Sequence, residues 1–298
     1  MKIKGLIHSV DLQFKIIGIK QNKRINFYYF QNSQMNLFKR YLYVGNWIEL
    51  EYDENHIVTK NKKCANVISY IYSLSGCGKL DNVVYYDKKS LNQSLSKFLK
   101  CLGNIMFLDL EMTMPSYNVK GKKTFKPELI QVGILLLDGE GEEILRYSNY
   151  VKPKLSPVLS KRCEDFLNIS ANDFSLKAID YEIFYEDFKE ILENYSPVIV
   201  VYGKNDILVL NDSYDINGMP SLKEKTRFIN LCQIIKSYYD LRNDPGLFKL
   251  YKLYYENQDI QVHDALSDSF VTSMVYKAFK DEVNNKTNKA EVIRSELE

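Results

Sequence analysis

The apolar pattern of this chain changes once, between residues 75 and 103, and the change separates two kinds of fold. Residues 1–74 contain short runs rich in Ile, Val, Phe and Tyr that are separated by polar turns, a pattern typical of β-strands. From residue 104 onward, short apolar runs alternate with longer amphipathic stretches, which indicates an α/β fold. The sequence therefore predicts a small all-β barrel followed by an α/β domain.

The spacing of apolar residues also predicts the individual elements. In the barrel domain, 1–74, we expect strands at residues 2–10, 13–19, 25–30, 47–52 and 65–74, and a short helix or irregular loop at 36–43. In the α/β domain, 104–280, we expect strands at 105–110, 129–137, 143–151 and 198–201 and helices at 181–194, 207–214, 231–241 and 265–280. A linker, 75–103, contains a helix predicted at 88–102, and the charged residues 281–298 are expected to form a frayed or disordered tail.

The charge of the chain is divided in the same place. The formal net charge is +2, but residues 1–100 contain 16 Lys and Arg against 7 Asp and Glu. The rest of the chain therefore has an excess of acidic residues. Basic segments commonly contact polyanions, and clustered carboxylates are often neutralised by metal ions. We therefore expect the N-terminal domain to bind a polyanion, and some of the acidic residues in the rest of the chain to bind metal ions.

Other features exclude several classes of protein. The most apolar stretch, 129–137, contains Gln131 and is shorter than the ~20 residues that a membrane span requires. The first ten residues lack the continuous apolar region of a signal peptide. The five cysteines include no C-x-x-C pair, which argues against a zinc site or a disulfide framework. We therefore expect a cytoplasmic protein without a membrane partner.

Two acidic residues interrupt the apolar strand that opens the second domain. Asp109 and Glu111 lie two apart near the end of residues 105–113, so both side chains leave the same face of the strand. Two buried carboxylates on one face repel each other, and desolvation adds to the free-energy cost. A divalent cation such as Mg²⁺ or Mn²⁺ would remove this conflict. An edge strand that ends in solvent accounts for the pair equally well.

Two later segments carry acidic residues beside helix starts. Asp206 follows the apolar run 198–201 and opens a helix, where a carboxylate is favoured by the helix dipole. His263 precedes the last predicted helix, Asp264 is suited to cap it, and Asp268 lies one turn inside. Each of these positions has an ordinary structural explanation when it is considered alone.

The order of these residues, however, resembles that of the DEDDh family of 3′-to-5′ exonucleases, which includes RNase T and the proofreading exonucleases. In this family an Asp-x-Glu ends the first strand, an Asp follows a later strand, and His-x-x-x-x-Asp enters the last helix. The resemblance covers residues 104–280 and implies an RNase H-like fold, in which a mixed central sheet is flanked by helices. It identifies the family's residues here as Asp109, Glu111, Asp206, His263 and Asp268.

Further segments are similar to one branch of the family. Gln131-x-Gly133 resembles the family's second strand, and position 264 is Asp rather than the Tyr of a sister group. Residues 150–153 and 159–169 are similar to the branch that includes KapD-type proteins and the animal exoribonucleases that trim histone mRNA and small RNAs. This similarity favours RNA as the substrate.

The resemblance implies phosphodiester hydrolysis with two divalent ions, Mg²⁺ or Mn²⁺. Asp109 would bridge both ions, and Glu111 and Asp268 would complete the tighter site. Asp206 would support the second ion, directly or through water. His263 would take the proton of the attacking water, because a histidine titrates near neutral pH.

The residues directly after Glu111 are expected to contact substrate. The backbone at Met112 and Thr113 would cradle the terminal nucleotide, and the Met112 side chain would wedge against its base. Packing in the apolar core is an equally good explanation for Met112.

Residues 2–74 resemble a cold-shock-type OB barrel, in which aromatic side chains stack on bases. Phe27, Tyr29 and Phe30 match the family's third-strand motif, whereas Ile16 and Gly18 stand where second-strand aromatics are expected. All three aromatic residues are predicted to contact nucleic acid, with Phe27 and Tyr29 as the predicted stacking residues. The predicted phosphate contacts are Lys15, Lys20, Lys23 and Arg24.

The sequence thus predicts a metal-dependent exonuclease that trims single-stranded 3′ ends, with RNA favoured over DNA. A DNA exonuclease of the proofreading or repair type is one alternative. A nucleic-acid-binding protein without catalysis is another, although all five catalytic positions are filled. These motifs do not define an oligomeric state.

Overall fold

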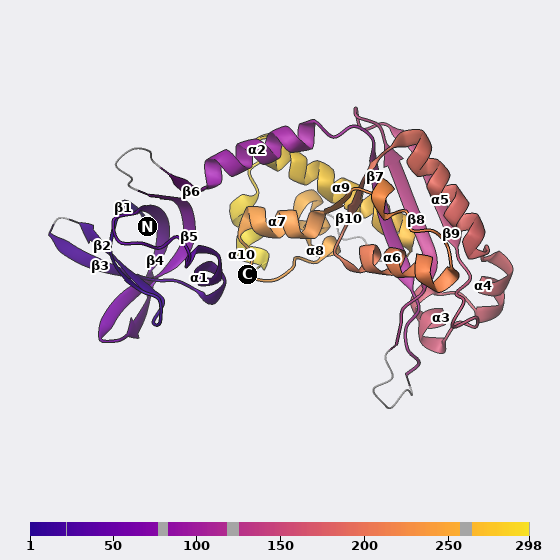
Figure 1. The fold of residues 1–298 in the computed structure, drawn as a ribbon, viewed down its shortest axis with the longest axis horizontal. Helices are drawn as coiled ribbons and strands as arrows, with labels where there is room; N and C mark the ends of the chain where they lie inside the picture. Colours follow the sequence, from indigo (N-terminus) through magenta and orange to yellow (C-terminus); the bar gives the residue numbers. More distant parts are fainter. Residues whose placement is uncertain (22, 77–82, 118–124, 257–263, 298) are drawn as a thin grey trace. The chain divides into compact units, whose positions relative to one another are not determined.

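The computed structural model describes residues 1–21, 23–76, 83–117, 125–256 and 264–297. These residues form two compact units, Met1–Lys97 and Phe98–Glu298, and Figure 1 shows the helices and strands of each. The boundary lies within helix α2 (Lys88–Lys100), where the sequence predicts a helix between two domains.

The first unit is a β-barrel. Its strands are β1 (Lys2–Asp11), β2 (Ile16–Gln21), β3 (Arg24–Tyr29), β4 (Trp47–Lys60), β5 (Lys63–Ser75) and β6 (Val84–Asp87), with helix α1 (Asn32–Phe38) after β3. The sheet order is β3-β2-β1-β4-β5-β6, and the additional parallel pairing of β3 with β5 closes the barrel. The predicted five-stranded barrel is therefore present, and its likeness to cold-shock barrels stays a prediction.

The predicted linker adds a strand to this sheet. β6 pairs antiparallel with the end of β5, where Tyr86 lies opposite Leu74. The ring of Tyr86 also meets that of Phe38 edge to face, with the ring centroids 5.0 Å apart. The boundary predicted at residue 74 thus falls inside the sheet rather than at its end. α2 begins directly after β6, close to the helix predicted at 88–102.

Strand alternation decides which aromatic side chains face the barrel core. Tyr28 and Phe30 are 1% and 0% exposed and pack in the core, whereas Phe27 and Tyr29 are half-buried. Successive residues of an extended chain point to opposite faces, so the aromatic run cannot present all its rings to one ligand. Phe30 stabilises the core, and the expectation that it contacts nucleic acid is corrected.

The second unit is built on a mixed five-stranded sheet. Its strands are β7 (Ile105–Met112), β8 (Leu129–Leu137), β9 (Glu143–Tyr150), β10 (Val198–Val201) and β11 (Phe228–Asn230). The order is β11-β10-β7-β8-β9. β8 runs antiparallel to both β7 and β9, whereas β10 runs parallel to both β7 and β11. β7 is therefore central, as its apolar sequence predicts.

Helices cover both faces of this sheet. They are α3 (Lys161–Leu167), α4 (Ala171–Lys177), α5 (Tyr181–Tyr195), α6 (Asn205–Asn217), α7 (Leu231–Tyr239), α8 (Leu247–Tyr255), α9 (Ala265–Val283) and α10 (Ala290–Leu297). Met106 and Leu108 of β7 pack in one core cluster with Phe184 of α5. On the opposite face, the rings of Phe107 and Tyr276 of α9 meet at 5.4 Å. Asp109 and Glu111 share the strand parity of Phe107 and so point toward the α9 face.

The C-terminal segment is ordered by contacts that the sequence pattern does not reveal. Ile293 of α10 is 0% exposed, and Arg294 Nε donates a hydrogen bond of 3.1 Å to the Tyr239 carbonyl at the end of α7. Glu282 accepts from Thr287 Oγ1 at 2.6 Å and from Lys289 N at 3.0 Å. The expectation of a frayed tail at 281–298 is therefore wrong.

The structure contains further elements for which no helix or strand was predicted, namely α3, α4, α8, α10 and β11. Within the described parts of the chain, no helix has both the length and the apolar character that crossing a membrane requires.

Candidate active site

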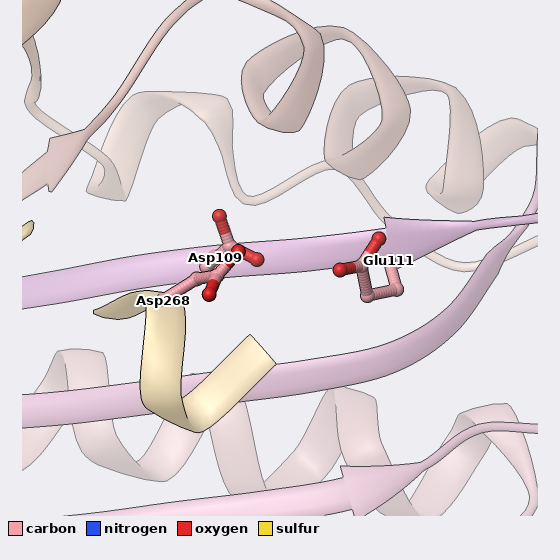
Figure 2. A group of neighbouring side chains, drawn as sticks. All are labelled: Asp109, Glu111 and Asp268. Atoms are coloured by element: carbon pink, nitrogen blue, oxygen red, sulfur yellow. The ribbon is translucent and has the colours of Figure 1, made fainter. Parts of the chain in front are cut away.

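Three carboxylates from β7 and α9 form one cluster. Asp109, Glu111 and Asp268 each bring a carboxylate oxygen within 4.8 Å of the others, and Figure 2 shows the two strand residues with Asp268 beside the same stretch of β7. Asp109 and Glu111 reach one face because they lie two apart on a strand. Asp268 lies in the first turn of α9, so the position of that helix determines the cluster.

A glycine on β8 allows α9 to approach the sheet closely. A Cβ atom at Gly133 would lie 2.1 Å from the backbone carbon of Ala265, the first residue of α9. Ser269 Oγ donates a hydrogen bond of 2.7 Å to the Gly133 carbonyl. The absence of a side chain at Gly133 thus leaves room for the start of α9, and the Ser269 hydrogen bond holds the turn that carries Asp268 against β8.

The start of α9 is capped and tied to the same strand. Asp264 accepts a hydrogen bond from Ser267 N at 3.0 Å, as the sequence predicts for an N-cap. Gln131 Nε2 donates to Asp264 Oδ1 at 2.7 Å. The Gln131-x-Gly133 motif therefore positions the start of α9. Gln131 orients the N-cap residue Asp264, and Gly133 leaves room for the helix to pack closely against β8.

Asp206 lies beside the cluster without belonging to the set of three. It is the second residue of α6, is 6% exposed, and accepts a hydrogen bond of 3.2 Å from Leu110 N through Oδ1. That bond ties the start of α6 to β7 between the two acidic positions.

Burial raises the pKa values of all four acids, and the negative charges of neighbouring acids add to the shifts of Asp109, Glu111 and Asp268. Burial, followed by the negative charges of Asp206 and Asp268, raises the pKa of Asp109 well above its usual range. Burial and the same neighbours raise the pKa of Glu111 to about 8. Burial and the charge of Asp264 raise the pKa of Asp268 to about 7. Burial also raises the pKa of Asp206 to about 6, although the Leu110 amide opposes the shift.

These acids fit divalent cations. Asp268 Oδ1 is buried and has no hydrogen-bond partner among the described residues. Carboxylate oxygens are the ligands that Mg²⁺ and Mn²⁺ prefer, and a cation would offset the repulsion that raises the pKa values. Asp109, Glu111 and Asp268 would hold one ion together, with Asp206 close enough to Asp109 to influence it electrostatically.

The predicted residues next to the acids have mixed outcomes. His263 lies outside the described residues, so its prediction stays untested. Met112 is half-buried and packs against the main core cluster, which is the alternative that its sequence left open. Thr113 is 4% exposed, and its hydroxyl accepts a hydrogen bond of 2.9 Å from Glu128 N. The Thr113 amide also donates a hydrogen bond of 2.8 Å to the Glu128 carbonyl, so the side chain and the amide are both used within the fold.

The predicted barrel contacts gather on the β2–β3 hairpin. Lys20, Lys23 and Arg24 are exposed there, whereas Lys15 is half-buried and bonds to the side chain of Asn32. The ammonium of Lys63 lies 5.0 Å from the ring centroid of Phe27, so that half-buried ring is partly engaged by a cation.

A cavity of about 370 Å³ adjoins the acids and includes residues that the sequence did not single out. It is lined by Asp109, Asp268, Tyr202, Gly246, Leu247, Phe248 and Lys249. The last four come from the start of α8. The signal that predicts this helix is Pro245-Gly246 followed by apolar residues at helical spacing, such as Leu247, Leu250 and Tyr254.

A mixed sheet of this order, with acids converging from its central strand and two helix starts, has the architecture of the RNase H-like exonuclease fold. Residues 106–276 match the family model described as exonuclease (RNase_T). The chain belongs to this family, whose DEDDh members are 3′-5′ exonucleases.

Relatives agree with this assignment. The chain is 31% identical over 183 residues to the probable 3′-5′ exonuclease KapD of Bacillus subtilis, covering 60% of this chain and 83% of KapD. It resembles the nuclease domain of 3′hExo, a DEDDh family member bound to rAMP, with a TM-score of 0.50, 20% identity and coverage of 61% and 94%. It also resembles cell-death related nuclease 4 (CRN-4), with a TM-score of 0.51 and 21% identity, covering 62% of this chain and 64%, less than two thirds, of that protein.

Proposed function

We propose that this protein is a divalent-metal-dependent 3′-5′ exoribonuclease that removes nucleotides one at a time from single-stranded ends. The observation that carries the proposal is the convergence of Asp109, Glu111 and Asp268 within 4.8 Å. The membership of the chain in an exonuclease family supports the reaction. The rAMP bound to 3′hExo supports RNA as the substrate class.

The reaction requires water to attack the last phosphodiester, so that the bond to the 3′ oxygen breaks and a nucleoside 5′-monophosphate leaves. Bound Mg²⁺ or Mn²⁺ would supply Lewis-acid stabilisation of the attacking and leaving oxygens. Asp109, Glu111 and Asp268 would hold and orient the ions, and Asp206 would support the second ion directly or through water. His263 accepts the proton of the attacking water.

End-labelled oligonucleotides test the reaction and its polarity. With Mg²⁺ or Mn²⁺, a 5′-labelled RNA should shorten progressively from its 3′ end, and a 3′-labelled RNA should release labelled mononucleotide at once. EDTA should stop both reactions, and the matching DNA strands should be cleaved more slowly. DNA cleaved faster than RNA would show a DNA exonuclease instead. Binding of both strands without metal-dependent cleavage would show a binding protein.

Two substitutions test the assigned residues. His263→Ala should reduce kcat by roughly 10²–10⁴-fold, the range for loss of a general acid or base, and Asp109→Asn should reduce kcat at least as much because it removes a charged ligand of the proposed metal site. His263→Ala should keep its affinity for metal and RNA, because it removes only the proton acceptor. Asp212→Asn, on the helix of Asp206 but outside the acid cluster, is the matched control. Near-normal turnover by His263→Ala would remove that residue from the mechanism.

We further propose that the barrel holds the strand through Lys20, Lys23 and Arg24, with Phe27 and Tyr29 stacking on bases. Exposure of the three cations on one hairpin supports this assignment. A basic surface with neighbouring aromatics is typical of single-strand binding.

A further inference from the structure

The cavity beside the acids has a wall to which the proposed function gives no role. Gly246, Leu247 and Phe248, at the start of α8, line the same cavity as Asp109 and Asp268. Its volume of about 370 Å³ lies within the range of ~300–1,000 Å³ typical of small-ligand sites. The start of α8 is therefore within reach of whatever occupies the metal-binding acids.

The N-terminus of α8 is left without a side-chain cap. Gly246 occupies the N-cap position and provides no acceptor for the amides of the first turn. Those amides have no acceptor within a helix, and they carry the positive end of the helix dipole. Helix ends of this kind bind anions, and phosphate groups in particular.

This helix start is held rigidly by its neighbours. Tyr202, which directly follows β10, donates a hydrogen bond of 2.6 Å to the Pro245 carbonyl. Asp244 accepts from Gln233 Nε2 at 3.1 Å and from Lys236 Nζ at 2.7 Å, both on α7. The turn before α8 is thus anchored to the sheet and to a second helix, which orients the first-turn amides before a ligand arrives.

An independent observation indicates a missing ligand in the cavity. Asp268 is 8% exposed and lines the cavity, and its buried Oδ1 has no hydrogen-bond partner among the described residues. Buried carboxylate oxygens are nearly always partnered, and a cation would partner this one. A phosphate in the cavity would then meet a cation on the acids and amide donors on α8.

We propose that the N-terminus of α8 is a phosphate subsite, whose first-turn amides donate hydrogen bonds to a backbone phosphate of the strand held at the acids. This inference rests on the proposed function and adds to it a group outside the four acids. Backbone amides contact phosphate oxygens and not the sugar. The subsite therefore contributes equally to RNA and DNA binding, and any preference between them arises elsewhere.

A side-chain cap introduced at Gly246 should compete with the phosphate. The residue has φ −69° and ψ 136°, and an added Cβ would meet only Lys249 Cβ, at 3.9 Å, so serine and alanine both fit. Gly246→Ser offers a hydroxyl to the same amides, whereas Gly246→Ala adds the same Cβ without it. We expect the KM for a single-stranded oligonucleotide to be about tenfold higher in G246S than in G246A, as befits the loss of a hydrogen bond to a charged group. The melting temperature of G246S should be no lower.

A second pair removes one donor. Leu247 is the first helical residue, where proline fits without disturbing the helix, and the extended Gly246 tolerates a following proline. Leu247→Pro deletes that amide, and Leu247→Ala accounts for the lost side chain. In the His263→Ala background, fluorescence anisotropy should give an oligonucleotide Kd that is several-fold higher for L247P than for L247A.

The outcomes separate the two proposals. If the wild-type protein cleaves oligonucleotides but KM and Kd are equal within both pairs, the phosphate subsite is wrong and the exonuclease assignment stands. If the wild-type protein cleaves neither RNA nor DNA, the proposed function itself is wrong. If only RNA binding responds to the substitutions, the contact involves the sugar and not the phosphate, which also overturns this inference.

Discussion

The four acids near β7 carry a free-energy cost that the side chains around them do not offset. The ion pairs of the described residues include none at Asp109, Glu111, Asp206 or Asp268. Burial instead raises the pKa values of all four, and repulsion by neighbouring acids adds to the shifts of Asp109, Glu111 and Asp268. Such a cluster is stable only when protons or cations occupy it.

This cost predicts a pH dependence of stability in EDTA. Because the folded pKa values lie above the unfolded ones, the folded state binds more protons between about pH 4 and about pH 8. The free energy of unfolding should therefore fall as pH rises through that window. Urea denaturation should show a smaller fall for Asp109→Asn than for the wild type, and Mg²⁺ should restore stability at pH 8. Identical pH profiles for the two proteins in EDTA would contradict the prediction.

The sequence predicted the acids better than it predicted the aromatic contacts, and the reason is geometric. Asp109 and Glu111 are two apart on one strand, so their common face follows from the spacing alone. Phe30 belongs to a run of consecutive aromatic residues, and the pairing partners of β3 decide which of them point inward. Those partners are remote in sequence, so the burial of Phe30 could not be derived locally.

Among the elements, α9 depends most on a single position of another element. Gly133→Ala would place a Cβ 2.1 Å from the backbone of Ala265, and the start of α9 would have to move with Asp268. We expect the free energy of unfolding to fall by about 1–3 kcal/mol, as for an overpacked core. We also expect kcat to decrease in the protein that remains folded, because Asp268 is displaced.

Gly139→Ala is the control for this substitution, because the added Cβ would come no closer than 3.9 Å to its nearest neighbour, the Cα of Gly103. Thermal denaturation and the oligonucleotide assay should show the difference between the two variants. Equal activity in G133A and G139A would mean that α9 does not need its close approach to β8.

The C-terminal helix provides a second test at this scale. Ile293 is 0% exposed, whereas its neighbour Val292 is 54% exposed. Ile293→Asp should cost roughly 3 kcal/mol, because it buries an unpaired charge. Val292→Asp should change the unfolding free energy by less than about 0.5 kcal/mol. Chemical denaturation measures both, and a small effect at Ile293 would show that α10 does not contribute to the fold.

Long periodic elements were predictable from the sequence, and short ones were not. The predicted helix at 181–194 and strand at 129–137 match α5 and β8 closely, because each contains several buried residues at regular spacing. α10 buries only Ile293, so its amphipathic signal is weak and its helix depends on contacts with Tyr239. Helix α8, which lines the cavity, was not predicted for a related reason, since Leu250 and Tyr254 are its only buried residues.

For the whole molecule, the unequal charge of the two halves is the feature with the broadest functional meaning. Residues 1–100 contain 16 Lys and Arg against 7 Asp and Glu, and the acids of the proposed active site all lie in the other unit. The excess of basic residues and the proposed metal-binding acids thus belong to separate units, each suited to a different kind of charged ligand.

The salt dependence of binding tests this division. Each cation that pairs with a phosphate of a single strand adds ~0.7 to the slope of log Kd against log salt. Replacing Lys20, Lys23 and Arg24 with glutamine should therefore lower that slope by up to about 2. The control replaces three exposed lysines of the second unit with glutamine: Lys177, Lys223 and Lys277. Equal slopes for the two triple variants would show that the barrel hairpin does not bind the strand.

The wide separation of the acids along the chain has a consequence for synthesis of the protein. The cluster needs Asp109 from the first strand of its unit and Asp268 from α9, a helix that follows every strand of that unit. A nascent chain that has already folded its basic barrel therefore still lacks a complete metal site. Formation of the acid cluster, and with it the proposed activity, therefore has to wait until α9 has left the ribosome.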